Sequence, residues 1–199
     1  MSTPSHDLIV FGATSFVGQI LTRYLAEHYG TQGALKWAIA GRSEAKLAAL
    51  RNSLGLAAGR LPLLVADAAD EAALRHLCKG ARVVVSTVGP YALYGEPLVK
   101  VCAETGTDYC DLTGEVQWIR RMIEAYEPAA RKSGARIVHC CGFDSIPSDL
   151  GVHFLQQQAR KRFGAPCTTV KMRVKAMRGG FSGGTAASLV NVVKEATAN

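Results

Sequence analysis

The sequence predicts an α/β protein built on a doubly wound parallel sheet. Three observations lead to this prediction. Strand-like and helix-like segments alternate over residues 7–141, the strand-like segments are apolar at nearly every position, and the first strand-to-helix turn is bounded by glycines. Strands that are apolar on both faces are typical of a parallel sheet that helices cover on both sides. Right-handed crossovers then give two βαβαβ halves.

Six strands are expected from short runs of apolar and β-branched residues. They are Asp7–Phe11, Leu35–Ala40, Leu61–Ala66, Arg82–Thr87, Asp108–Asp111 and Ala135–Cys141. The helices between them are expected from apolar residues at helical spacing and from capping residues. They are Val17–Tyr29, a helix that Ser43 caps, Glu71–Cys78, Leu98–Glu104 and Val116–Lys132. We therefore predict a Rossmann-type domain that binds NAD(P) over residues 1–147.

Residues 148–199 are expected to form a linking helix and the start of an α+β second domain. The helix is predicted over Ser148–Phe163, with Ser148 as N-cap and Gly164 as the stop. Charged and apolar residues then alternate over Thr168–Met177, which predicts an antiparallel-type strand with one face towards solvent or ligand. A glycine loop leads into a last helix without a stop signal. We therefore expect an N-terminal fragment whose substrate or dimerisation domain is truncated.

The charge of the chain argues against a nucleic-acid partner. Residues 1–150 hold 15 Lys and Arg against 15 Asp and Glu, so the net charge of +7 comes from residues 151–199, with eight against one. No helix-turn-helix, ribonucleoprotein or zinc-finger motif accompanies the basic end. Four basic residues there could meet an anionic carrier such as phosphopantetheine, or form a solvated face: Lys171, Arg173, Lys175 and Arg178.

The sequence lacks the usual signals for membrane insertion, secretion and metal binding. No run of about 18 apolar residues and no secretion signal is visible, which predicts a cytoplasmic location. The six cysteines show no Cys-x-x-Cys spacing, and so we expect neither a metal site nor a disulfide framework.

The turn after the first strand has the pattern of a dinucleotide-binding turn. Its residues are Gly12, Ala13, Thr14, Ser15, Phe16, Val17 and Gly18. Gly12 permits a tight turn, Gly18 lets the helix approach the sheet, and the N–H groups of a helix N-terminus favour a pyrophosphate. Ser15 stands where a glycine is usual, but its hydroxyl can cap the helix and donate to a phosphate oxygen. The alternative is a tight turn that binds no ligand.

The end of the second strand indicates which cofactor binds. Gly41, Arg42 and Ser43 follow without an acid until Glu44, whereas NAD enzymes place an acid here for the ribose 2′-hydroxyl. A guanidinium with a neighbouring hydroxyl suits the 2′-phosphate of NADP instead. The alternative is a solvated arginine beside a helix cap. Asp67, after the third strand, could face the adenine amino group or cap the next helix.

The fourth strand is expected to end against the cofactor. Thr87, Val88, Gly89 and Pro90 follow its apolar run, at the sheet edge where ligands of doubly wound proteins bind. An ordinary turn is the alternative.

Five segments together resemble one family, the saccharopine dehydrogenase-like oxidoreductases, and within it the trans-acting enoyl reductases. They are GATSFVG, AIAGRS, VVVSTVGPYALYGEPLVKVCAETGTDYCDLTGE, CCGFDSIPSDLG and RGGFSGGTAAS. The resemblance implies an NADP-binding domain, a second domain with dimer contacts, and hydride transfer from NADPH to an enoyl chain in lipid, polyketide or glycolipid assembly. The parent family instead forms or cleaves a secondary amine between amino acids. Ser15 departs from the family's usual glycine.

The resemblance also implies partners: a small-molecule or carrier-bound acyl substrate, a second copy in a homodimer, and peripheral contact with a membrane or lipid. Two other functions stay open, namely a saccharopine-type amino-acid dehydrogenase or reductase and a non-catalytic NADP-binding regulator, whereas a third, a short-chain dehydrogenase, is disfavoured. The last needs Tyr-x-x-x-Lys, and none of the nine lysines has a tyrosine four residues before it.

Several side chains are candidate proton donors near the expected nicotinamide. They are Tyr91, Tyr94, Asp111, Thr113, Glu115, Asp144 and Ser145. Asp144 could equally form a local turn by bonding the backbone of Ile146. Asp111 could serve only the turn after its strand, and His139 is expected to be a core histidine. No residue is therefore assigned a catalytic role.

Overall fold

The structure is a computed structural model that describes residues 4–55, 59–176, 178–180 and 183–197 of the 199. Six parallel strands form one sheet in the order β3-β2-β1-β4-β5-β6. The strands are β1 (His6–Phe11), β2 (Trp37–Gly41), β3 (Leu63–Val65), β4 (Ala81–Ser86), β5 (Asp108–Asp111) and β6 (Ile137–Val138). The predicted doubly wound α/β sheet is confirmed.

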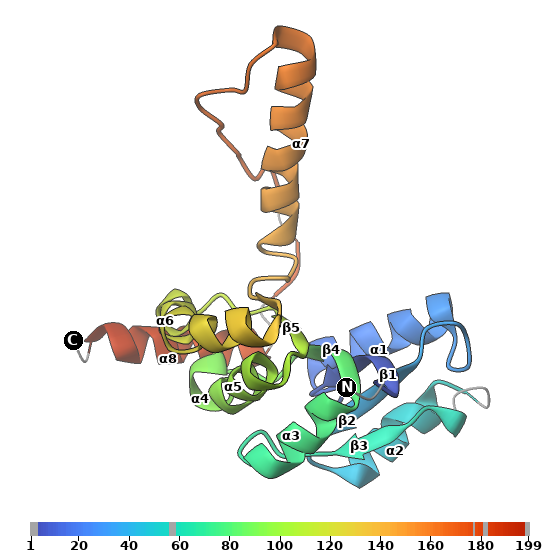
Figure 1. The fold of residues 1–199 in the computed structure, drawn as a ribbon. Helices are drawn as coiled ribbons and strands as arrows, with labels where there is room; N and C mark the ends of the chain where they lie inside the picture. The colour runs from blue at the N-terminus through green and yellow to red at the C-terminus, as the bar shows by residue number, and fades with distance from the viewer. Residues whose placement is uncertain (1–3, 56–58, 177, 181–182, 198–199) are drawn as a thin grey trace.

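Eight helices are formed by the part of the chain that the structure describes (Figure 1). They are α1 (Phe16–Tyr29), α2 (Glu44–Ser53), α3 (Glu71–Lys79), α4 (Tyr91–Tyr94), α5 (Glu96–Thr105), α6 (Val116–Ser133), α7 (Ile146–Phe163) and α8 (Gly183–Thr197). The short helix α4 was not predicted from the sequence.

Three of the predicted strands are shorter than expected: the second begins at Trp37 rather than Leu35, and the third and sixth are shortened for local reasons. The third strand begins only after Pro62, which has no N–H to offer a neighbouring strand. The sixth spans two residues, because Cys140 has φ 62° in the left-handed region and turns its N–H to the Asp111 carboxylate.

Two clusters of buried apolar side chains lie on the two faces of the sheet. Ile9 and Phe11 of β1 belong to one cluster and Val10 to the other, because successive residues of a strand point to opposite faces. The first cluster is completed by α3, α5 and α6, the second by α1 and α2. The sheet is thereby covered as the continuous apolar strands predict.

The carboxyl ends of three central strands lie level with one another. Phe11 of β1 pairs with Ser86 of β4, and Ser86 pairs with Asp111 of β5. The loops that follow these strands therefore leave the sheet at the same edge, which is where a doubly wound fold binds its ligand.

The segment after the sheet differs from its prediction. Helix α7 begins at Ile146 rather than after Ser148, because the N–H groups of Ser145 and Ile146 already bond Gly142 O and Pro147 favours a first turn. Ser148 therefore lies inside the helix, and the prediction that it is the N-cap is wrong. The predicted stop is confirmed, since Gly164 ends the helix with φ 75°.

Helix α7 stands away from the rest of the fold (Figure 1). Ala159 is its one buried residue, whereas Leu150, Phe154 and Phe163 are exposed.

No strand forms over residues 168–176, so the prediction of a strand at Thr168–Met177 is wrong for the residues described; Met177 lies outside them. A strand needs a neighbouring strand for its N–H and C=O groups, and none of the described strands pairs with this segment. Its apolar Met172 and Val174 are exposed, as are its basic residues.

None of the helices described has the length and apolar content needed to cross a bilayer.

Candidate cofactor site

The turn between β1 and α1 is held against β2 by its backbone. The N–H groups of Gly12 and Ala13 both donate to Ala40 O, at 2.9 and 3.1 Å. Gly12 has φ 84°, and a Cβ there would lie 2.6 Å from Val88 Cγ2. A Cβ on Gly18 would lie 2.3 Å from Gly12 O. The two glycines are thus required by a tight turn and by a close helix, as the sequence predicts.

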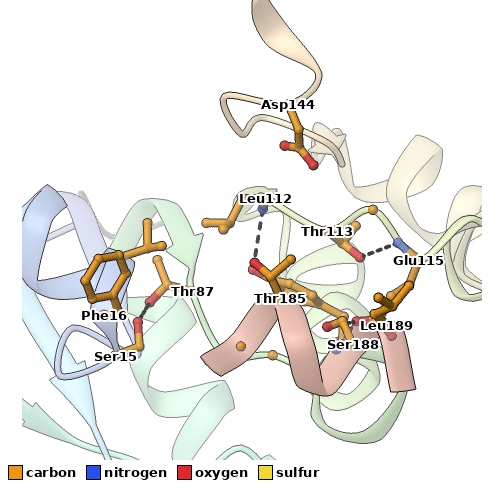
Figure 2. A pocket seen from close by; sticks show the side chains of 15 residues that line it. Ser15, Phe16, Thr87, Leu112, Thr113, Glu115, Asp144, Thr185, Ser188 and Leu189 are labelled. Atoms are coloured by element: carbon orange, nitrogen blue, oxygen red, sulfur yellow. Dashed lines mark hydrogen bonds between the residues drawn. The ribbon is translucent and has the colours of Figure 1, made fainter. Parts of the chain in front are cut away.

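Ser15 caps α1, as expected. Its Oγ accepts a hydrogen bond from Gly18 N at 3.0 Å, and its hydroxyl donates to Thr87 Oγ1 at 3.0 Å (Figure 2). Thr87 Oγ1 in turn donates to Gly12 O at 2.8 Å. The serine therefore joins the turn to the end of β4, and its predicted contact with phosphate stays a prediction.

The start of α1 offers donors to an anion. Phe16 and Val17 occupy its first turn, where N–H groups have no carbonyl partner inside the helix. No acidic residue lies in that turn to oppose a negative ligand. The backbone carbonyl of Thr14 is held by Gln19 Nε2 at 3.1 Å, which fixes the loop before the helix. The arrangement suits a pyrophosphate.

The end of β2 presents a free arginine. Arg42 is exposed and forms no hydrogen bond or ion pair with any residue that the structure describes. Ser43 caps α2 by accepting a hydrogen bond from Lys46 N at 3.4 Å, as expected. Gly41 is buried and accepts a hydrogen bond from Ala66 N. A guanidinium that no carboxylate neutralises fits a 2′-phosphate.

Asp67 does not cap the helix that follows it. Its carboxylate accepts a hydrogen bond from Ala69 N at 2.9 Å in a local turn, and Asp70 caps α3 through Ala73 N. That alternative is therefore wrong, whereas the contact of the exposed Asp67 with adenine stays a prediction.

A cavity of about 360 Å³ opens beside the phosphate turn, at the carboxyl edge of the sheet (Figure 2). Its walls come from the loops after β1, β4, β5 and β6 and from α8. They are formed by Ser15, Phe16, Val17, Thr87, Gly89, Tyr91, Leu112, Thr113, Gly114, Glu115, Asp144, Gly184, Thr185, Ser188 and Leu189.

Five predicted cofactor residues line this cavity: Ser15, Phe16, Val17, Thr87 and Gly89. Gly41, Arg42, Ser43 and Asp67 do not, as expected of residues assigned to the adenosine end. The remaining six, Gly12, Ala13, Thr14, Gly18, Val88 and Pro90, adjoin it in the same two loops. Pro90 follows a cis peptide and precedes α4.

Glu115 is a buried carboxylate with three donors. The N–H groups of Tyr91 and Ala92 reach it at 2.8 and 2.9 Å, and Ser188 Oγ of α8 donates at 2.8 Å. These contacts hold the start of α4 and attach α8 to the cavity wall. The carboxylate is occupied as an acceptor, which leaves it a structural rather than a proton-donating role.

Tyr91 and Asp111 are likewise occupied. The Tyr91 hydroxyl donates to Ser86 O at 3.0 Å, and burial raises the pKa of this phenol well above its ordinary value. Asp111 accepts hydrogen bonds from Tyr109 Oη at 2.9 Å and from Thr113 N, and it lies 2.6 Å from His139 Nδ1. These hydrogen bonds fix the loop after β5. They agree with the alternative that Asp111 serves the turn after its strand rather than proton transfer.

Four candidate donors remain. Tyr94 is exposed and does not line the cavity, and Ser145 stands at the start of α7. Thr113 and Asp144 line the cavity.

The sequence did not predict that α8 lines the site. Its residues Thr185, Ser188 and Leu189 close one wall, and the glycine-rich sequence before it was the available signal.

No group of three or more His, Cys, Asp or Glu residues in the described ranges could hold a metal ion.

The residues present fit NADP. Gly12 and Gly18 leave the space that a backbone approach to pyrophosphate needs, Arg42 has no partner among the described residues, and a cavity lies where the nicotinamide would extend from the turn.

Comparison with known proteins agrees with this geometry. Residues 8–138 match the family described as "Saccharopine dehydrogenase NADP binding domain". A trans-acting enoyl reductase of Mycobacterium ulcerans is 48% identical over 153 residues, which is 77% of this chain and 36% of that protein. A Mycobacterium tuberculosis protein, provisionally named a trans-acting enoyl reductase, is 46% identical over 191 residues, 96% of this chain and 45% of its own length.

Among solved structures, apo saccharopine dehydrogenase (L-Glu forming) from Saccharomyces cerevisiae resembles the fold. Its TM-score is 0.52 at 21% identity, covering 75% of this chain and 32% of that one. The chain thus spans less than half the length of the relatives it matches. From its turn, its strand order and these matches, the chain belongs to the saccharopine dehydrogenase NADP-binding domain family, whose cofactor is NADP.

Proposed function

We propose that the protein is an NADPH-dependent oxidoreductase that reduces the double bond of a lipid or polyketide enoyl chain presented as a neutral thioester. One observation carries the choice of substrate. The described side chains that line the cavity are hydroxyl-bearing, apolar or acidic, and include no Lys, Arg or His. An amino-acid substrate brings carboxylates that need a cationic partner, whereas an enoyl thioester needs apolar walls and hydrogen-bond donors. The names of the mycobacterial relatives support this choice.

In this proposal, different segments of the chain bind different parts of the cofactor. Residues 12–18 hold the pyrophosphate through backbone N–H groups, and Arg42 with Ser43 holds the 2′-phosphate. Residues Thr87–Pro90 lie along the nicotinamide riboside. When bound, NADPH supplies the hydride.

Thr113 is suited to hold the substrate carbonyl. Its Oγ1 accepts a hydrogen bond from Glu115 N at 3.1 Å, and its hydroxyl hydrogen has no acceptor among the residues described. A hydroxyl that still has a hydrogen to donate can polarise the thioester carbonyl, which helps the β-carbon accept hydride.

An assay of NADPH consumption tests the proposal. The protein, expressed at the full length of its gene, is given crotonyl pantetheine or, separately, lysine with 2-oxoglutarate. We expect oxidation of NADPH and formation of butyryl pantetheine with the first substrate. Turnover of only the amino-acid mixture would favour the saccharopine-type alternative, and NADPH binding without turnover of either would favour the regulator.

Partners follow from the same proposal. Lys171, Arg173, Lys175 and Arg178 are exposed between α7 and α8, where they can meet the phosphate of an acyl-carrying phosphopantetheine. Homodimer formation, a cytoplasmic location and peripheral contact with lipid stay predictions of the sequence.

A further inference from the structure

Asp144 has a carboxylate for which the described part of the chain provides no hydrogen-bond or ion-pair partner. It lies in the loop between β6 and α7, and its side chain points towards the cavity (Figure 2). The turn around it is closed by the backbone, since Ser145 N and Ile146 N donate to Gly142 O at 3.2 and 2.9 Å. The carboxylate forms no hydrogen bond or ion pair with the described residues. Asp144 is therefore not the side-chain turn former that the sequence left open.

The described residues that line the cavity around Asp144 include acidic side chains and no basic ones. The other acid of the cavity, Glu115, is buried and already accepts three hydrogen bonds. Burial is the main cause of the raised pKa of the Cys140 thiol, the Asp111 carboxylate raises this pKa further, and the negative charge of Asp144 makes a smaller contribution in the same direction. The described cavity wall supplies no cation. A positive charge that enters the cavity thus meets one carboxylate that nothing has neutralised.

The nicotinamide ring brings such a charge. The cavity starts at Ser15, Phe16 and Val17 of the phosphate turn, so the part of the dinucleotide beyond the pyrophosphate extends into it. The ring is neutral in NADPH and carries one positive charge in NADP⁺. On reduction of an enoyl thioester, a hydride with its two electrons forms the new C–H bond at the β-carbon. A proton from water completes the α-carbon, and one positive charge remains on the ring.

We propose that the Asp144 carboxylate stabilises the positive charge that the nicotinamide ring acquires as it donates hydride. The inference rests on the proposed function, because it needs the nicotinamide in this cavity. A fixed charge that attracts only the oxidised ring favours the hydride-donating direction, since the attraction grows along the reaction. Asp144 is exposed, so water would weaken its attraction for the ring, and the expected effect is therefore moderate.

Binding measurements test the assignment without any substrate. Isothermal titration gives Kd for NADPH and for NADP⁺ with the unmodified protein and with Asp144→Asn, Asp144→Glu and Asp149→Asn. Asp149 is a matched control, because it is an exposed aspartate in the first turn of α7 and does not line the cavity.

We expect Asp144→Asn to weaken NADP⁺ binding relative to NADPH by about three- to tenfold, less at high salt. Asp144→Glu and Asp149→Asn should leave the ratio of the two Kd values near that of the unmodified protein. An unchanged ratio in Asp144→Asn, or an equal change in Asp149→Asn, would overturn the role of Asp144 while the cofactor assignment stands. Failure of the unmodified protein to bind either nucleotide would instead overturn the proposed function.

Discussion

The hydroxyl of Ser15 donates a 3.0 Å hydrogen bond to Thr87 Oγ1, across 72 residues of sequence. This bond joins the phosphate turn to the end of β4. The Thr87 hydroxyl in turn donates a hydrogen bond to Gly12 O, in the same turn. The serine that replaces a customary glycine is therefore part of the support of the turn.

Ser15→Gly should be mild. Glycine is an acceptable N-cap that costs a few tenths of a kcal/mol relative to serine, whereas Ser15→Ala removes the cap and costs about 1 kcal/mol. Urea unfolding measures both, and titration with NADPH should show less than about a threefold loss of affinity for Ser15→Gly. Ser15→Leu should abolish NADPH binding by filling the phosphate space, and unchanged affinity there would mean that the turn is only structural.

Arg42→Ala should convert the cofactor preference. Loss of a charged partner for the 2′-phosphate weakens NADPH binding by about 10- to 100-fold and leaves NADH, which lacks that phosphate, unaffected. Isothermal titration with both nucleotides measures the ratio. Arg120→Ala, at an exposed arginine of α6, is the control. Equal weakening of NADPH and NADH by Arg42→Ala would show that Arg42 does not read the 2′-phosphate.

Gly18→Ala should destabilise the domain by more than about 2 kcal/mol. The new methyl would lie 2.3 Å from Gly12 O, a backbone atom that cannot move without opening the turn. Gly151→Ala in α7 is the matched control, since no atom of the described residues would lie within 4 Å of a Cβ there, and it should stabilise that helix by up to about 1 kcal/mol. Chemical unfolding compares the two; similar effects would contradict the packing argument.

Glu115→Gln should destabilise more than Ser188→Ala. The amide keeps one acceptor oxygen but places its NH2 against the N–H group of either Tyr91 or Ala92, at about 2–3 kcal/mol, whereas Ser188→Ala removes one bond of three, at about 1 kcal/mol. Hydrogen exchange should also show faster exchange in α8 for Ser188→Ala. Unchanged exchange there would show that this bond does not hold the helix.

Arg136→Gln should reduce stability in a pH-dependent way. The Arg136 side chain, 3.0 Å from Asp108 Oδ2, lowers the pKa of that carboxyl below its usual 3.8, against the opposing effect of burial. A carboxyl with a lowered folded pKa stabilises the fold above its unfolded pKa, and this contribution disappears as pH falls through the folded pKa.

We therefore expect Arg136→Gln to lower the free energy of unfolding slightly at pH 7, since the arginine is largely exposed, and the difference to vanish well below pH 4. Urea unfolding across that range measures it. A difference that persists at low pH would assign the effect to packing instead of charge.

Much of the fold could be predicted from local patterns. Apolar runs predicted six parallel strands, and serine followed by helical spacing predicted the caps at Ser15 and Ser43, because such signals depend on residues that are neighbours in sequence. The strand at 168–177 was predicted by the same kind of pattern, but alternation alone supplies no hydrogen-bond partner.

The sequence by itself determined the sheet, the phosphate turn and the family. Only the tertiary structure decided which acids of the site are occupied, because their partners are distant in sequence: Glu115 meets Ser188 across 73 residues, and Asp111 meets His139 across 28. The sequence predicted the last helix but not its place against the cavity, because the residues that α8 contacts there are distant in sequence. Asp144 differs from the other candidate acids in having no hydrogen-bond partner among the described residues, and this difference depends on which side chains the fold brings near it.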